Sequence, residues 1–255
     1  MIDFDKFLQM IENTPELYNA GVEQGINEFS SLNDELEQIL YSTDTGGKSF
    51  YDEFWESVKA ASSCVGLFAG AMWNDLTFKP PFDITLYGSC NYCFVRNGFQ
   101  GDLVECLNAR NVKLIQKNIS QAAYMFAWSM FTRIGVLDFS NCSSIIYCFS
   151  GTNYLKKIDK IILTETLNLT GAFDTCPALE EIEFDGIIGK ALSFANSTKL
   201  SKASIENIIN CLSTTTSGLT VTFSQEAVTS AFGSTDNSEW INLMNTRKNW
   251  TISLA

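Results

Sequence analysis

Two cysteines at a C-x-x-C spacing, Cys90 and Cys93, are the residues whose spacing could support metal or redox chemistry. A structural zinc site would need a second such pair or histidine ligands, and the 255-residue sequence has neither a matching pair nor any histidine. The other six cysteines are scattered along the chain. We therefore favour reduced, buried cysteines that pack as small apolar side chains, with metal or redox chemistry as the alternative. On this basis we expect no metal site and no cofactor.

A run of carboxylates, EEIEFD at 180–185, is the second candidate for chemistry. Glu181, Glu183 and Asp185 alternate with apolar residues, which predicts that the three acids share one face of a strand. Hydrolysis of a glycosidic bond requires two carboxylates across a cleft, and a flat strand face seldom provides one. The absence of histidine also excludes Ser-His-Asp and Cys-His catalysis. We therefore expect no catalytic residue and no enzymatic activity.

Charge is distributed unevenly along the chain. The net charge is -12 at pH 7, and residues 1–62 alone contain thirteen acids and three bases. An acidic segment followed by a nearly neutral body argues against nucleic acid or an anionic membrane as a partner. No stretch approaches about 18 consecutive apolar residues, so we expect no membrane insertion. The start, MIDFDKFLQM, lacks a basic region followed by an apolar run, so we also expect no signal peptide.

The N-terminal region, residues 1–48, has the apolar spacing of helices, first at 3–12 and then from Pro15 to about Leu40. The second helix carries a heptad-like series of apolar residues: Val22, Phe29, Leu32, Leu36 and Ile39. Gly25 occupies one of the heptad positions and weakens the series. Two interpretations remain open, a helix that packs on its own domain and a short stalk that forms a homo-oligomer. The composition of STDTGGKS, residues 42–49, predicts a linker.

Three segments within residues 112–199 are similar to one another at a period of 23 to 24 residues. Each contains a Phe, then a polar turn, then an Ile; the pairs are Phe126 and Ile134, Phe149 and Ile158, and Phe173 and Ile182. A weaker fourth copy surrounds Phe194. Internal similarity at a period of about 20–29 residues indicates a solenoid of the leucine-rich-repeat type. We expect the Phe rings to stack and the strand segments IDKIIL and IEFDGII to lie in a parallel sheet.

The repeat also predicts which charged side chains are neighbours. Arg133, Lys157 and Glu181 share one repeat position, and Lys156 and Glu180 share the position before it. We expect Lys156 to face Glu180 and Lys157 to face Glu181 as exposed pairs.

A stack of repeats needs a cap at each end. Residues 49–111, with predicted helices at 50–63 and 101–110, would supply the first cap. Residues 200–255 would supply the second, an α/β module with helices at 200–212, 225–232 and 238–248 and strands at 217–224 and 250–254. The residues expected to cap its helices are Ser201 or Ser204, Ser224, and Asp236 or Ser238.

Aromatic residues near the stacked phenylalanines are candidates for binding. Tyr124 and Tyr147 share a repeat position two residues before the Phe, and Trp128 and Tyr154 lie in the adjoining turns. Rows of aromatic side chains suit glycan or protein recognition, because each ring provides contact area at a low entropy cost. The alternative is that these rings cover the ends of the core.

Several stretches share their order and content with a known family: YDEFWESV, WNDLTFKPPFDI, YCFSGTNYLKKIDKIIL and the run from LSKASIENIINCL to NWTISL. Over about residues 50–255 the chain resembles the BspA-like leucine-rich-repeat proteins, and in particular the short forms encoded by phages and prophages of gut Firmicutes. The resemblance implies an α+β fold, namely a solenoid with parallel strands, a helical N-terminal segment and an α/β C-terminal cap. It implies no catalytic site.

The resemblance also suggests a function. BspA-like surface proteins are adhesins, and their phage relatives look like components of the tail or host-contact apparatus. We therefore expect a non-enzymatic structural or adhesive protein of a phage virion, assembled in the host cytoplasm. Its partners would be other virion proteins or a host-surface glycan or protein. The alternative is a bacterial cell-surface adhesin that lacks its export signal.

Overall fold

A computed structural model describes residues 50–70 and 80–255, and this part of the chain is a mixture of helices and parallel strands in three small sheets. The chain divides into two compact units, Met1–Ser62 and Ser63–Ala255. The first unit contributes α4 (Phe50–Ala60), an amphipathic helix whose Phe54, Trp55 and Val58 are buried. The predicted helix at 50–63 is therefore confirmed, and it ends at Ala60.

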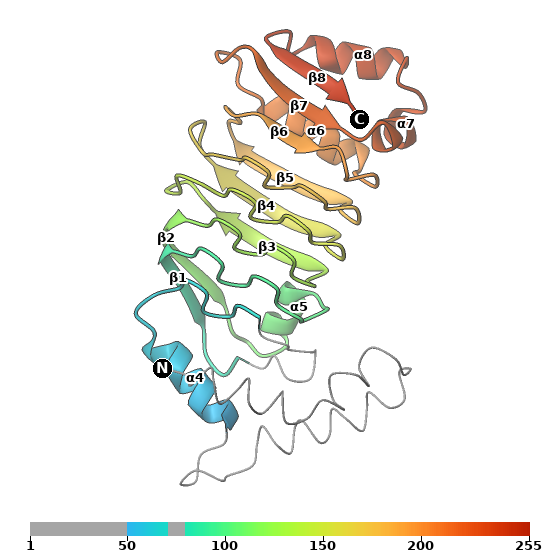
Figure 1. Cartoon of the computed structure of the whole chain (residues 1–255). Helices are drawn as coiled ribbons and strands as arrows, with labels where there is room; N and C mark the ends of the chain where they lie inside the picture. Colours follow the sequence, from blue (N-terminus) through green and yellow to red (C-terminus); the bar gives the residue numbers. More distant parts are fainter. Residues whose placement is uncertain (1–49, 71–79) are drawn as a thin grey trace, which may run out of the picture. The chain divides into compact units, whose positions relative to one another are not determined.

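The strands of the second unit all pair in parallel (Figure 1). The first sheet joins β1 (Ile84–Ser89) to β2 (Leu114–Gln121), the second has the order β3 (Arg133–Asp138), β4 (Lys157–Leu163), β5 (Glu181–Gly186), and the third has the order β6 (Leu192–Phe194), β7 (Leu219–Phe223), β8 (Trp250–Leu254). Each sheet therefore grows by one strand for each passage of the chain, as parallel pairing with long connections requires.

The register of β3, β4 and β5 agrees with the sequence repeat. Arg133 pairs with Lys157 and Lys157 with Glu181, while Ile134, Ile158 and Ile182 form a second aligned and buried row. The predicted Lys157–Glu181 ion pair is present, with Nζ and Oε2 2.5 Å apart. Lys156 and Glu180 are also neighbours, because the Glu180 N–H donates to the Lys156 carbonyl at 2.9 Å. Among the described residues no side-chain ion pair joins these two.

Five short segments outside the strands share one backbone conformation. We call Gly66–Gly70, Tyr92–Arg96, Tyr124–Trp128, Tyr147–Gly151 and Gly171–Thr175 the stacked segments; in each, the first and last residues have a positive φ and the central residue is a Phe. Successive segments are joined by backbone hydrogen bonds, for example from the N–H groups of Tyr124, Phe126 and Trp128 to the carbonyls of Ile146, Cys148 and Ser150, at 2.8–2.9 Å. The backbone N–H and C=O groups of adjacent stacked segments thus hydrogen-bond to one another, as those of adjacent strands do.

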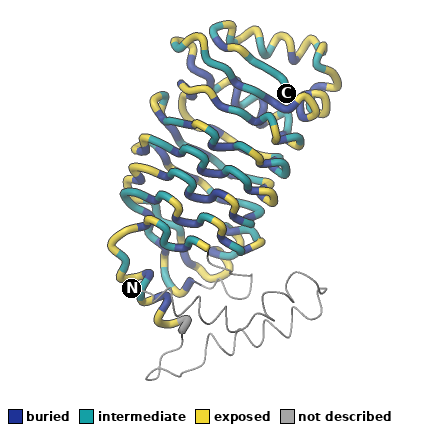
Figure 2. Tube along the Cα trace, viewed as in Figure 1, coloured by how far each residue is buried: buried dark blue, intermediate teal, exposed yellow. Residues whose placement is uncertain are grey.

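The five central phenylalanines, continued by Phe194 of β6 and Phe223 of β7, form one continuous buried stack, the phenylalanine column. Its members, each at most 1% exposed, are Phe68, Phe94, Phe126, Phe149, Phe173, Phe194 and Phe223. Neighbouring ring centroids lie 4.7–6.1 Å apart. We call each successive repeat of strand and stacked segment a level. Figure 2 shows buried stretches inside successive levels and exposed residues at their margins. The predicted stacking of Phe126, Phe149 and Phe173, and the weaker copy at Phe194, are confirmed.

The column begins earlier than the repeat in the sequence indicates. Phe68 and Phe94 lie within residues 49–111, which the sequence suggests as a cap. From Phe94 to Phe126 the spacing is 32 residues, because the chain inserts α5 (Leu103–Asn108) before β2. This longer interval hides the first two copies from a search at a period of 23 to 24.

A row of buried polar residues follows the column. Each lies three residues after a phenylalanine: Asn97, Ser129, Thr152, Cys176 and Ser197. Two of them donate to the phenylalanine carbonyl of the preceding level, Asn97 Nδ2 to Phe68 at 3.5 Å and Cys176 Sγ to Phe149 at 3.1 Å. Asn97 and Cys176 therefore tie one level to the next inside the core, whereas Ser129 Oγ and Ser197 Oγ make no hydrogen bond among the described residues.

The helices after residue 200 begin at side-chain caps. Ser201 caps α6 (Lys202–Cys211) and Ser224 caps α7 (Gln225–Phe232), as expected. For α8 (Ser238–Asn245) both expected caps, Asp236 and Ser238, are wrong, because Asn237 accepts the Glu239 N–H at 2.8 Å. Asn caps a helix as well as Ser or Asp does, and the residue chosen is the one with an extended backbone directly before the first turn.

Candidate binding surface

Three tyrosines of the stacked segments form a ladder on the outside of the unit. Tyr92, Tyr124 and Tyr147 are each the first residue of a segment, and their rings stack with centroids 5.3 and 5.2 Å apart and interplanar angles of 7° and 26°. The last ring of the ladder lies over Gly171, where any added Cβ would collide with it. Because the ring faces cover one another, the ladder presents mainly ring edges and phenolic hydroxyl groups to solvent.

A second row runs beside the ladder through the last residues of the segments. The indole of Trp128 stacks against Tyr124 with centroids 5.9 Å apart, and it lies over Gly151, which has no side chain to obstruct it. The guanidinium of Arg96 lies 5.7 Å from the centroid of the Trp128 ring, within range of a cation–π interaction. We call Tyr92, Arg96, Tyr124, Trp128 and Tyr147 the aromatic platform.

All five platform residues have a left-handed backbone, with φ between 52° and 59°. This conformation costs a residue with a side chain about 1–2 kcal/mol, and glycine adopts it freely. Glycine occupies the same positions in other segments, at Gly66, Gly151 and Gly171. A stacked aromatic pair returns about 0.5–1.5 kcal/mol beyond its buried area, so stacking offsets a strain of this size. At Tyr92, Trp128 and Tyr147, each stacked on one ring among the described residues, stability therefore gives little reason to prefer an aromatic residue over glycine.

The structure brings together three of the four residues that the sequence suggests for binding. The ring of Tyr124 stacks on both Trp128 and Tyr147. Trp128 is 47% exposed. Tyr154 is 43% exposed, but within the described ranges no ring contact joins it to the platform.

Two members of the platform, Tyr92 and Arg96, are absent from the sequence prediction. Tyr92 is 45% exposed and begins the ladder. The triplet Tyr-x-Phe occurs at 92, 124 and 147, so this short motif contains the signal that the period misses.

No protein-family model, curated protein or solved structure matches this chain.

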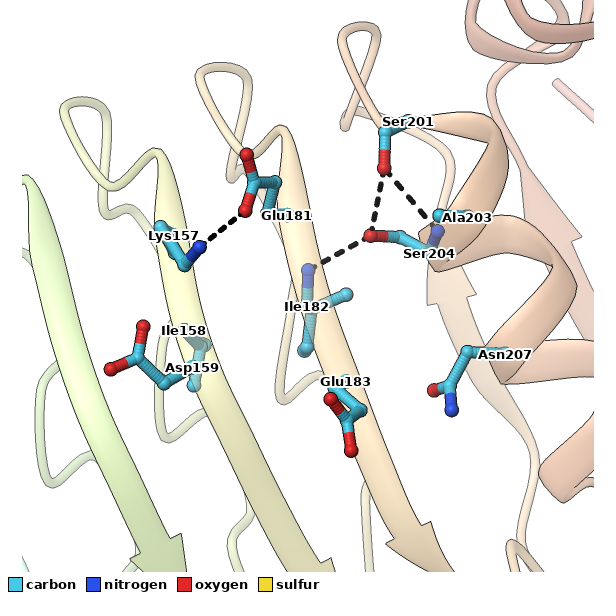
Figure 3. Close-up of a pocket in the computed structure, with 10 residues that line it drawn as sticks. All are labelled: Lys157, Ile158, Asp159, Glu181, Ile182, Glu183, Ser201, Ala203, Ser204 and Asn207. Atoms are coloured by element: carbon cyan, nitrogen blue, oxygen red, sulfur yellow. Dashed lines mark hydrogen bonds and ion pairs between the residues drawn. The ribbon is translucent and has the colours of Figure 1, made fainter.

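A groove of about 450 Å³ lies on another surface, between the outer faces of β4 and β5 and the start of α6 (Figure 3). Its polar lining includes Lys157, Asp159, Glu181, Glu183, Ser204 and Asn207. Glu181, Glu183 and Asp185 share the exposed strand face, as predicted. The expectation of a flat surface is wrong here, because α6 stands beside β5 and forms one wall of the groove.

The carboxylates of this groove are all engaged by bases of the neighbouring strands. Arg133 binds Asp159 through two hydrogen bonds, of 2.9 and 2.8 Å. Glu181 pairs with Lys157, and Glu183 Oε1 lies 2.8 Å from Lys160 Nζ. The hydrogen bond that Lys160 donates to Glu183 is the main cause that raises the pKa of Lys160. The acids therefore act as hydrogen-bond acceptors in a charge-paired strand surface.

The wall of the groove also closes the edge of β5. The Ile182 N–H donates to Ser204 Oγ at 2.9 Å, and the Phe184 N–H donates to Asn207 Oδ1 at 2.7 Å. Asn207 Nδ2 then donates to the Phe184 carbonyl at 3.1 Å. Side chains of α6 thus take the place of a further strand, which protects a sheet edge from pairing with another chain.

The cysteines with the C-x-x-C spacing are buried in the second stacked segment and just before it. Cys90 and Cys93 have no exposed surface, and Cys64 lies close enough to Cys90 for a thiol–thiol hydrogen bond, which lowers the pKa of Cys64 to about 7. Burial raises the pKa of Cys93. In the described ranges no cluster of three or more Cys, Asp or Glu is placed to hold a metal ion.

Two further expectations concern association and membranes. The proposed oligomerisation residues, Val22, Phe29, Leu32, Leu36 and Ile39, lie outside the described residues, so that prediction stands as a prediction. Within residues 50–70 and 80–255, no helix combines the length and the apolar character needed to cross a bilayer.

Proposed function

We propose that the repeated levels of residues 63–255 form a solenoid of the BspA-like leucine-rich-repeat type, with the module from residue 200 as its C-terminal cap. Three observations support this assignment: the parallel strand pairing, the shared conformation of the five stacked segments, and the phenylalanine column from Phe68 to Phe223. Each level buries its apolar edge only against its neighbours, as in other repeat proteins. The result is a stiff scaffold for a binding surface.

The chain acts, in this proposal, as a non-enzymatic structural and adhesive protein whose aromatic platform contacts the partner. One observation carries the proposal: Tyr92 and Trp128 are exposed, Tyr124 and Tyr147 are half-buried, and all four are held in a left-handed backbone that glycine adopts without strain. Strain that stability does not require points to a role of the side chains at the surface. Tyr and Trp supply contact area at a low entropy cost, and Arg96 adds a donor at the margin.

The setting we propose is a phage virion, on the strength of the sequence resemblance. The chain would be a tail or host-contact component assembled in the host cytoplasm, with other virion proteins and a host-surface glycan or protein as partners. The alternative setting is a bacterial cell surface. The same platform would serve as an adhesive surface in both.

A cell-binding assay tests the proposed function. Fluorescently labelled full-length chain is incubated with a panel of gut Firmicutes strains and compared with the Tyr92→Gly, Tyr124→Gly, Tyr147→Gly triple variant. We expect the wild type to bind at least one strain and the triple variant to lose most of that binding with an unchanged fold. Equal binding by the two proteins, or no binding to any strain, would reject the platform as the adhesive surface.

The setting is tested separately from the surface. Peptide mass spectrometry of density-purified phage particles is expected to detect the chain at a fixed ratio to the major tail proteins. Detection only among peptides released by protease from intact bacterial cells would support the surface adhesin. Turnover of a polysaccharide panel by the purified chain would contradict a non-enzymatic function.

We also propose that the chain forms a homo-oligomer through its N-terminal helix. The heptad-like series from Val22 to Ile39 supports this, because such spacing forms a seam between helices. Mass photometry of the full-length chain and of a chain starting at Ser49 tests it. A single monomer mass for both proteins would show that the helix does not drive self-association.

A further inference from the structure

The aromatic platform carries much less charge than the strand surface beside it. Only two charged residues, Arg96 and Asp174, occur in the four stretches that contain the stacked segments from Tyr92 to Thr175. These stretches are residues 88–100, 119–131, 142–154 and 166–178. The neighbouring strand surface at 133–138, 156–163 and 180–186 contains ten. In a chain of net charge -12, a surface with so little charge is poorly suited to an ionic partner.

Apart from Arg96, the platform presents uncharged donors and acceptors. Phenolic hydroxyls come from the three tyrosines, and further neutral groups come from nearby side chains such as Asn91, directly before Tyr92, and Thr170, directly before Gly171. Asn91 Nδ2 donates to Gln121 Oε1 at 3.2 Å, and Thr170 Oγ1 donates to Asn168 Oδ1 at 2.8 Å, so these side chains are already ordered. Ordered, neutral hydrogen-bonding groups beside phenolic hydroxyls match the hydroxyl groups of neutral sugars.

The platform also repeats in one dimension. Tyr92, Tyr124 and Tyr147 recur at 5.3 and 5.2 Å, each on its own level of the stack. A partner that repeats at a similar distance can place an equivalent group on each ring, and an extended β-linked polysaccharide does so with each successive sugar.

From these three observations we infer that the partner of the platform is a neutral polysaccharide with an extended backbone, lying along the tyrosine ladder. The inference rests on the proposed binding function and names its ligand class. Because the ladder presents ring edges and hydroxyls, each sugar makes few contacts, and affinity accumulates along the chain. A protein partner is the competing outcome, since Tyr, Ser and Asn also dominate antibody binding surfaces.

Affinity electrophoresis of the full-length chain provides the test. Native gels contain konjac glucomannan, barley β-glucan or hydroxyethylcellulose as neutral extended probes, and polygalacturonate or alginate as anionic ones. We expect retardation by at least one neutral probe and by neither anionic probe. The Tyr92→Gly, Tyr124→Gly, Tyr147→Gly variant should weaken the apparent Kd about tenfold or more.

Two further variants guard against misinterpretation. Replacing the same tyrosines by Phe keeps the stack and removes only the hydroxyls, and it should also weaken binding while the Tm stays within a few degrees. The double variant Lys157→Ala, Glu181→Ala alters the charged strand face and should leave retardation unchanged. Circular dichroism and Tm show whether each variant is folded.

Lack of retardation by all neutral probes, retardation by anionic probes alone, or equal retardation of the wild type and both tyrosine variants would overturn the inference. The cell-binding assay then separates this failure from failure of the proposed function. If protease treatment of the cells abolishes tyrosine-dependent binding and periodate treatment does not, the partner is a protein and the proposed function stands. If the tyrosine variants bind cells as the wild type does, the proposed function fails as well.

Discussion

The phenylalanine column and the tyrosine ladder are two stacks of aromatic rings built on the same segments. Phe126 and Tyr124 are two residues apart, and both stack on their counterparts of the next level, with centroids 5.7 and 5.2 Å apart. The phenylalanines are buried, whereas Tyr92, the first ring of the ladder, is 45% exposed. The backbone therefore sets one spacing for both stacks, and burial makes the inner one a core and the outer one a surface.

The difference shows how a repeated scaffold can separate stability from binding. Burial of a Phe removes a large apolar area from water, which is the main stabilising contribution to a fold. An exposed, strained tyrosine gains little by comparison. A change in the ladder should therefore alter binding with a small effect on folding, and a change in the column should do the reverse.

The largest expected effect is in the column. Phe149→Ala removes a ring that is stacked on both sides by Phe126 and Phe173, and it should lower the free energy of unfolding by about 3–5 kcal/mol. Urea unfolding followed by circular dichroism measures this. The matched control is Tyr147→Gly in the same segment, which should change the free energy of unfolding by no more than about 1 kcal/mol. Similar losses for the two variants would erase the distinction between column and ladder.

A pH effect is expected from the residue between the two stacks. Cys148 lies between Tyr147 and Phe149, and burial raises its pKa well above the usual range, as it does for Cys93. The stabilising contribution of a thiol whose folded pKa is raised is complete below the unfolded pKa of about 8.5 and is lost above it. Each of these thiols should lower the free energy of unfolding by about 1.4 kcal/mol per pH unit once the unfolded thiol is ionised.

Urea unfolding under reducing conditions between pH 7 and pH 9.5 measures this loss. The Cys148→Ala variant should show a shallower decline with pH than the wild type. If the free energy of unfolding declined identically with pH in the two proteins, Cys148 would not be protected by burial. The residue between the ladder and the column would then be accessible to water.

A smaller effect separates strain from stacking within the ladder. Tyr124 has a φ of 55°, so Tyr124→Ala keeps the left-handed strain and loses the stack, whereas Tyr124→Gly loses both. The Gly variant should be more stable than the Ala variant by about 1 kcal/mol, the reverse of the usual order. The control is the neighbouring Ala123, which lacks a positive φ, so Ala123→Gly should destabilise the protein. If Tyr124→Ala were more stable than Tyr124→Gly, the left-handed backbone at this position would not be strained, and the argument for the platform from strain would fail.

The smallest effect is expected on the charged strand face. Lys157 and Glu181 form an exposed ion pair between adjacent strands, and a double-mutant cycle with Ala should give a coupling energy of about 0.2–1 kcal/mol. The coupling should fall as salt is added. A coupling several times larger would indicate that this face, and not only the column, stabilises the stack.

Some of these features follow from the sequence because they depend on local alternation. Ile158 and Ile182 face inward and Lys157 faces Glu181 because residues one apart on a strand point to opposite sides, so the repeat sets the register. Ser201 and Ser224 are caps that can be identified because the capping residue directly precedes the helix. The stacking of Phe126, Phe149 and Phe173 follows from their near-constant spacing.

Other features exist only in the folded chain. Phe68 and Phe94 join the column across a 32-residue interval, and Tyr92 joins the ladder with them, because backbone hydrogen bonds between segments bring the chain back into line after the α5 insertion. The side chains of Ser204 and Asn207 extend from α6 and accept hydrogen bonds from the edge of β5. No local sequence pattern predicts these contacts. The sequence by itself determined which residues point inward and how often the pattern recurs. Tertiary structure decided which distant segments are neighbours and which backbones are left-handed, since both depend on stacking energy gained only when all levels are in place.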